Sequence, residues 1–186
     1  MSKLPPISVI LFSKEHNMRV LMAMVAVATG ALACKDATTP RGFANAGPSF
    51  TLADGFTSTL VGRGNLGTFN IQSKAAGYDV KLKSHDNTDI AVANIVVTPG
   101  GHSGWHFHPG PVLVVVKTGA ITFYHGNDPT CTGTVHRAGT AFVEADGEVG
   151  IARNEGAVEA TVVATFFVPA GGPTRIDAAA PGNCAF

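Results

Sequence analysis

The sequence has little charge and no excess of either sign. Its 186 residues include 13 lysines and arginines against 13 aspartates and glutamates, and charged residues make up only 14% of the chain. No run of basic residues with interleaved aromatics occurs, so the electrostatic footprint of a nucleic-acid-binding protein is missing. We therefore expect no nucleic-acid partner.

Several catalytic signatures are also missing. The chain has no Gly-rich phosphate loop followed by a helix, no Gly-x-Ser-x-Gly elbow, and no internal repeat of about 20–50 residues. These absences leave nucleotide-dependent, phosphoryl-transfer and hydrolase activities without residue support.

No apolar run is long enough to span a bilayer. The run 20–33, preceded by Lys14 and Arg19, has the length of a signal-peptide core. It ends in small residues before Cys34, so we expect residues 1–33 to be removed. Cys34 resembles the lipidated cysteine of bacterial lipoproteins, although Ala31 and Leu32 stand in the reverse of the usual order. We expect an exported protein, either held in the cell envelope (periplasm or outer surface) by a lipid on Cys34, its only membrane contact, or plainly secreted.

The remainder of the chain divides into a tether and one domain. Residues 34–55 are small, polar and interrupted by proline and glycine, which predicts a flexible tether. Residues 56–186 contain short runs rich in β-branched and aromatic residues, separated by turn sequences, and no sustained helical periodicity. We predict an all-β sandwich or barrel. The expected strands are 59–61, 67–71, 78–82, 89–98, 104–108, 112–117, 120–125, 133–137, 140–144, 149–154 and 160–168. In two of them, 90–98 and 160–168, both the odd- and the even-numbered positions are apolar, which predicts central strands covered on both faces.

Only two cysteines remain once Cys34 is assigned to the processing site. Cys131 lies in a turn-rich stretch and Cys184 lies near the C-terminus. In an oxidising compartment such a pair suggests one disulfide, closing a loop of about 50 residues. Two separate thiols are the alternative.

The stretch 100–110 carries the main chemical signal. His106 and His108 are two residues apart, so on a strand both imidazoles leave the same face and can converge on one ion. Phe107 would face the other way. A His-x-His pair alone is a weak signal, because surface pairs arise by chance.

The surroundings of the pair resemble a known family. Gly100, five residues, His106-x-His108, a Pro-Gly turn and Gly119 resemble the first motif of the cupin superfamily, and the stretch 139–154 is similar to the second. The position of Cys131 and the closing residues up to Cys184 also resemble small exported cupins. The resemblance implies a double-stranded antiparallel β-helix, a jelly-roll β-barrel, with the histidines inside.

The chain departs from the cupin metal motif at two positions. Cupins that bind a metal commonly supply a Glu and a third His, and here Val112 and Gly150 stand in their places. The resemblance carries His106 and His108 over as ligands of a divalent transition metal (Fe, Mn, Cu, Zn or Ni), with weaker binding than a four-ligand site gives. We expect binding to weaken below about pH 6 as imidazoles protonate.

A third ligand must come from elsewhere. His102 lies in a Gly-rich loop that could fold over the barrel mouth, and Glu144 lies at a strand end near the second motif. His125 and His136 flank the loop with Cys131 and are better explained as surface or paired structural residues. We expect Val112, Gly150 and Trp105 in the pocket, with Trp105 either packed structurally or forming a wall for an aromatic or sugar ring.

Two functions remain open. Two histidines and one further ligand would leave open metal positions, as in a dioxygenase-like oxidoreductase or an isomerase. The missing Glu and His favour instead a non-enzymatic envelope module that binds a small molecule or carbohydrate over a vestigial metal site. In either case the partner is a small molecule, and a homodimer through sheet edges is a candidate assembly.

Overall fold

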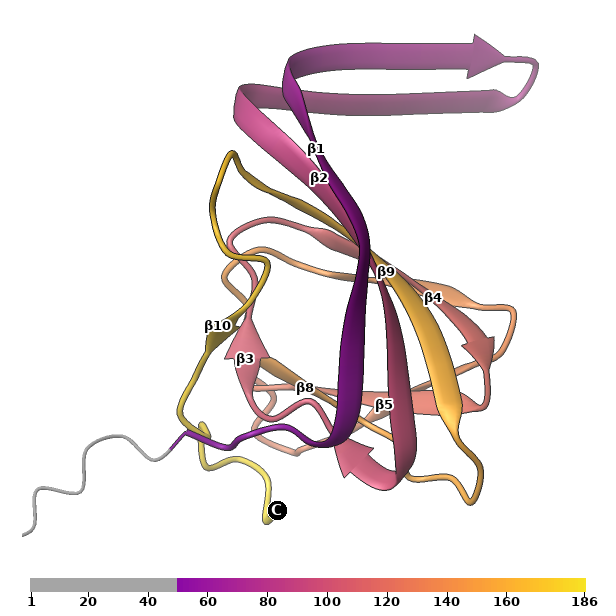
Figure 1. Cartoon of the computed structure of the whole chain (residues 1–186). Helices are drawn as coiled ribbons and strands as arrows, with labels where there is room; N and C mark the ends of the chain where they lie inside the picture. The colour runs from indigo at the N-terminus through magenta and orange to yellow at the C-terminus, as the bar shows by residue number, and fades with distance from the viewer. Residues whose placement is uncertain (1–49) are drawn as a thin grey trace, which may run out of the picture. The chain divides into compact units, whose positions relative to one another are not determined.

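A computed structural model of the chain describes residues 50–186 (Figure 1). The expected signal segment 1–33, Cys34 and the tether up to residue 49 lie outside these residues. Within them, Phe50 forms an isolated β-bridge with Ala179, and the first strand starts at Asp54. The boundary between tether and domain at residue 55 stays a prediction. None of the described residues forms a helix that is long and apolar enough to cross a membrane.

The described part is built from strands that all pair antiparallel. They are β1 (Asp54–Ala75), β2 (Tyr78–His102), β3 (His106–Phe107), β4 (Val112–Thr118), β5 (Ala120–His125), β6 (Thr134–Arg137), β7 (Ala141–Glu144), β8 (Gly150–Arg153), β9 (Ala160–Pro169) and β10 (Ile176–Asp177).

The strands form two ladders joined at one point. One ladder runs β1-β2-β9-β4-β7 and the other β10-β3-β8-β5-β6, and they are connected where His102 of β2 pairs with Arg153 of β8. In Figure 1 the two ladders curve around a common interior. This nearly closed antiparallel barrel confirms the fold class expected from the sequence, an all-β double-stranded β-helix.

Alternating side chains of the long strands fill the barrel. On β9 the residues Ala160, Val162, Ala164, Phe166 and Val168 are buried, and those between them are half-buried. β2 alternates in the same way from Ala91 to Val97. The expectation that these two strands are covered on both faces was therefore wrong. A barrel has a single interior, and no helix of the described residues covers its outer face.

Two predicted strand breaks are absent. The segments 59–61 and 67–71 belong to one strand, β1, and 78–82 and 89–98 belong to β2. Glycines of β1 lie at shifts in the β1–β2 register, between Leu60 and Gly62 and on both sides of Gly67. They therefore act as bulges, which bend a strand without ending it. The outer half of this hairpin extends beyond the barrel as a two-stranded arm (Figure 1).

β10 was not expected from the sequence. Ile176 and Asp177 pair with Phe107 and His106 of β3. Two residues are too few to show an alternating pattern, yet this pairing brings the segment that precedes β10 beside the predicted histidines.

Candidate metal centre

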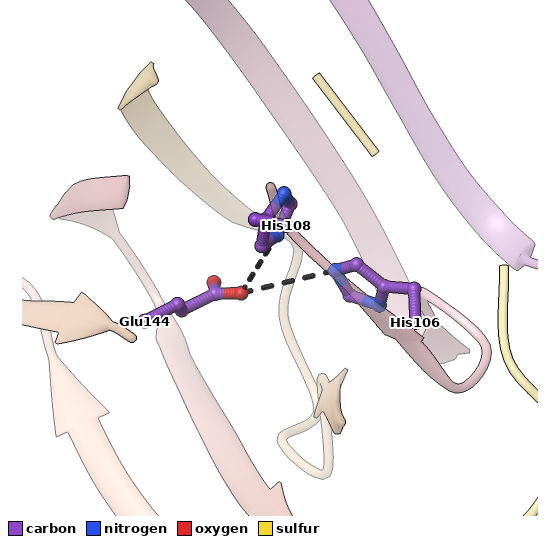
Figure 2. A group of neighbouring side chains, drawn as sticks. All are labelled: His106, His108 and Glu144. Carbon is purple, nitrogen blue, oxygen red and sulfur yellow. Dashed lines mark hydrogen bonds and ion pairs between the residues drawn. The ribbon is translucent and has the colours of Figure 1, made fainter. Parts of the chain in front are cut away.

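His106 and His108 lie inside the barrel, as the resemblance to cupins implied, and they share a face, as their spacing predicted. Their side chains are buried, and the ring centroids are 4.8 Å apart with the rings nearly perpendicular. His106 belongs to β3 and His108 follows it directly (Figure 2). The short strand thus directs both rings to the same face.

Backbone carbonyl groups orient both rings. Nδ1 of His106 lies 2.9 Å from the carbonyl oxygen of Gly104, and Nδ1 of His108 lies 2.5 Å from that of Thr174. A carbonyl oxygen only accepts, so each Nδ1 carries the proton and donates it. In a neutral imidazole the lone pair then lies on Nε2, which is the tautomer that a metal ligand needs.

Glu144 supplies a carboxylate to the same point. It ends β7, and its Oε2 lies 3.0 Å from Nε2 of His108 and 3.8 Å from Nε2 of His106 (Figure 2). The three groups offer ligand atoms that all lie within 4.8 Å of one another. Two ligands of one divalent ion, each at about 2.0–2.2 Å, are at most about 4.4 Å apart, so the two measured distances fit a shared ion.

The three candidate ligand atoms require a cation between them. With both Nδ1 atoms protonated, the two Nε2 lone pairs and the carboxylate oxygen face one another, and three acceptors without a positive charge between them would repel. Either a proton or a metal ion satisfies them. Burial lowers the pKa of His106 to about 4, with Arg175 and His108 acting in the same direction and Glu144 opposing them. His106 is therefore neutral at pH 7 and ready to bind a metal.

A cavity of about 100 Å³ opens onto this group. Most of its lining is apolar and comes from the interior faces of β2, β4 and β9, including Val97, Val112 and Phe166. Its polar lining comes from the residues Ser58, Ser103, His106, His108, Glu144, Thr174 and Arg175.

The two departures from the cupin motif have different outcomes. Val112 lines the cavity as expected, and it pairs across the β4–β7 ladder with Glu144. The carboxylate therefore enters the site from the neighbouring strand, directly opposite the motif position. Gly150 pairs with His106 but does not line the cavity. A Cβ at Gly150 would lie 2.2 Å from Cζ of Phe123, so the Phe123 ring fills the place of the fourth ligand.

The other candidates lie away from the group. The ring of His102 accepts a hydrogen bond at Nδ1 from the backbone N–H of Gly104. His125 lies 2.7 Å from a carboxylate oxygen of Glu148, and His136 stacks on Phe142. None of these histidines belongs to the metal-ligand group found among residues 50–186.

Trp105 does not line the cavity. It is buried and stacks on the C-terminal Phe186, with ring centroids 6.4 Å apart and an interplanar angle of 7°. Its packing matches the structural alternative for this residue, since no cavity wall is formed by the indole.

Thr174, Arg175 and Ser103 were not anticipated. Thr174 and Arg175 precede β10, and the sequence around them, Gly-Gly-Pro-Thr-Arg, looks like a turn. The only available signal was an arginine in a chain with few charges. Ser103 donates to the carbonyl of Gly104, the same group that orients His106.

The predicted disulfide is present. Cys131 and Cys184 are bonded across a sequence separation of 53 residues. The alternative of two separate thiols is thereby excluded, and the C-terminal segment is tied to the loop after β5.

The fold and the site together define a class. An antiparallel barrel of two facing ladders, with the His-x-His pair of the first motif inside it, is a cupin-type barrel. The chain therefore has the cupin-type fold, and it carries a candidate His-His-Glu metal site.

Comparison with protein-family models gives no match, and neither does comparison with curated proteins. Among solved structures, one of oxalate oxidase is 28% identical over 43% of this chain and 42% of its own, with a TM-score of 0.38. An uncharacterized conserved protein with a double-stranded β-helix domain from Klebsiella pneumoniae is 24% identical over 59% of this chain and 84% of its own (TM-score 0.41). A cupin 2 conserved barrel domain protein from Leptotrichia buccalis is 11% identical over 59% and 39% (TM-score 0.40). The matches cover less than half of the oxalate oxidase chains.

Proposed function

We propose that this protein is a metal-dependent enzyme of the oxidoreductase type that acts on a small molecule inside the barrel. The observation that carries the proposal is the convergence of His106, His108 and Glu144 at the edge of a largely closed, mostly apolar cavity. Two histidines and one carboxylate are a ligand set typical of non-haem iron sites, and they leave coordination positions open.

The residues of the site have separable tasks. The carbonyls of Gly104 and Thr174 hold the two imidazoles in the ligating tautomer. Glu144 would neutralise one of the two charges of a bound divalent ion. The apolar walls keep bulk water away, which strengthens every charge interaction inside. A divalent transition metal bound there would supply Lewis-acid or one-electron redox chemistry.

The disulfide supports export as part of this proposal. Disulfides persist in oxidising compartments and are rare in the cytosol. The bond between Cys131 and Cys184 is what a protein of the cell envelope or the extracellular space would carry.

Metal analysis of the purified full chain tests the proposed function. We expect about one equivalent of a divalent transition metal, and we expect His106→Ala, His108→Ala and Glu144→Gln to lose it because each removes one of three ligands. His136→Ala is the matched control, since this ring stacks on Phe142 outside the group.

The alternative, a binding module with a vestigial site, is favoured by the two absent motif ligands at Val112 and Gly150. It predicts that iron(II), manganese, copper and zinc produce neither heat nor a thermal shift at neutral pH. That result would refute the enzyme proposal.

A further inference from the structure

We propose that the cavity selects a small carboxylate, with Arg175 as the residue that recognises its charge. The inference rests on the proposed function, because the metal would supply part of the positive charge. It concerns which molecule enters the site, and it is carried by Arg175, by the charge of the site and by the size of the cavity.

Arg175 lines the same cavity as the candidate ligands. Its guanidinium is hydrogen-bonded through Nε and Nη2. Nη2 donates to the carbonyl of Ser103 at 2.7 Å, and Nε and Nη2 both lie within 2.8 Å of Oδ1 of Asp177. Among the hydrogen bonds of the described residues, none involves Nη1. A guanidinium has five N–H donors, so the group keeps donors for a further acceptor.

The charges favour an anion. A divalent ion bound by Glu144 and two neutral histidines keeps a net single positive charge, and Arg175 adds another. Asp177 offsets part of the charge of Arg175, but its side chain is 49% exposed and does not line the cavity. In an apolar enclosure a neutral guest would leave the net charge of the ion uncompensated, whereas a carboxylate can bind the ion and accept hydrogen bonds from the guanidinium.

The cavity size limits the guest to a few non-hydrogen atoms. About 100 Å³ is well below the roughly 300–1,000 Å³ of pockets that take drug-sized ligands. Trp105, the residue best suited to stack on a ring, lies outside the cavity. The size of the cavity argues against a sugar or aromatic substrate and for a short-chain acid.

Calorimetric titration of the metal-loaded full chain tests the inference. We expect glycolate and acetate to bind at least about tenfold more tightly than their neutral analogues ethylene glycol and acetamide, since a charge-assisted hydrogen bond is made only with the acids. Arg175→Gln should remove this preference while the metal content stays unchanged. Arg137→Gln, on β6 and outside the cavity, is the matched control and should keep the preference.

A second variant changes affinity in the opposite direction. Asp177→Asn removes the counter-charge of Arg175 but keeps the arginine, so acetate should bind several-fold more tightly. This variant also tests the role of the charge if Arg175→Gln fails to fold. Equal binding of acids and neutral analogues by the wild type, or unchanged acetate affinity in both Arg175→Gln and Asp177→Asn, would overturn the inference.

The two proposals fail in different ways. A protein that holds metal but shows no preference for acids refutes the carboxylate inference alone. A protein that holds no metal refutes the proposed enzyme. Acetate is then titrated into the metal-free wild type and into the metal-free Arg175→Gln variant, and tighter binding by the wild type shows that the anion site exists without the metal.

Discussion

Two backbone carbonyls decide which nitrogen of each imidazole faces the cavity. The carbonyl of Gly104 comes from the loop before β3, and that of Thr174 comes from the segment before β10. Because main-chain atoms are less mobile than side chains, both lone pairs are aimed before any ion arrives. Preorganisation of this kind lowers the cost of binding and offsets part of the loss of a fourth ligand.

The buried state of His106 predicts a pH dependence of stability. Its pKa is lowered from 6.5 to about 4, so between these values the unfolded chain takes up a proton that the folded chain does not. The free energy of unfolding of the metal-free protein should therefore fall as the pH drops from about 6.5 to about 4, by up to about 3 kcal/mol. Urea unfolding at several pH values measures this slope.

The variant His106→Leu isolates the contribution of this residue. It removes the titrating group but keeps an apolar side chain in the buried position, so the slope should become shallower than in the wild type. Equal slopes in the two proteins would contradict the prediction. Because of the lowered pKa, protons compete with a metal ion for Nε2 of His106 only below the pH of about 6 that an ordinary imidazole would give.

At the scale of elements, one carboxylate ties together the two strands of the long hairpin and the end of β9, at the point where β2 begins to pair with β9. Asp89 of β2 accepts hydrogen bonds from Arg63 and Asn65 of β1 and from the backbone N–H of Gly171 after β9. These donors lower its pKa to about 2, with the bond from Gly171 as the largest cause. Beyond this clamp the arm is an isolated pair of strands, and such pairs have little stability of their own.

The packing of β8 against β5 gives a stability prediction. Gly150→Ala would place a Cβ 2.2 Å from the Phe123 ring, inside a packed core. We expect a loss of about 1–3 kcal/mol in the free energy of unfolding, measured by chemical denaturation.

Gly64→Ala is the control for this substitution, because no atom lies within 4 Å of its added Cβ. If both variants unfold at the same denaturant concentration, Phe123 does not occupy the space at Gly150 as described.

How far the sequence predicted each element depended on its length and periodicity. The bounds of β4, β5 and β9 were predicted to within a residue or two, because each strand is an apolar run between clear turn sequences. His106 and His108 followed from strand alternation together with the resemblance of their surroundings to the first cupin motif. The roles of Thr174 and Arg175 depend on the pairing of β10 with β3, which joins segments about 70 residues apart and leaves no local trace. Glu144 was only one candidate among four, since its place opposite Val112 is set by the β4–β7 register.

At the scale of the molecule, the C-terminal segment packs against the outside of the barrel near the loop after β5. Asn183 donates to the carbonyls of His125 and Asp128, and the ring of Phe186 covers Trp105. The disulfide between Cys131 and Cys184 fixes this arrangement covalently.

Removing the disulfide tests how much it stabilises the domain. We expect the double variant Cys131→Ser/Cys184→Ser to lose about 2–4 kcal/mol, because the bond restricts the unfolded chain across a separation of 53 residues. Thermal unfolding of the variant and of the oxidised wild type measures the loss. The reduced wild type should unfold like the variant, and identical midpoints for all three proteins would contradict the prediction.

The pairing of Val112 with Glu144 also bears on how such sites can be found and how they change over time. A pattern that reads residues only along the chain scores this protein as having lost its acidic ligand. A pattern that also reads across the hydrogen-bonded neighbours of each position scores the ligand as present. In an antiparallel ladder, paired positions on adjacent strands can present a side chain to the same point, so a chain can keep an acidic ligand that its sequence pattern lacks.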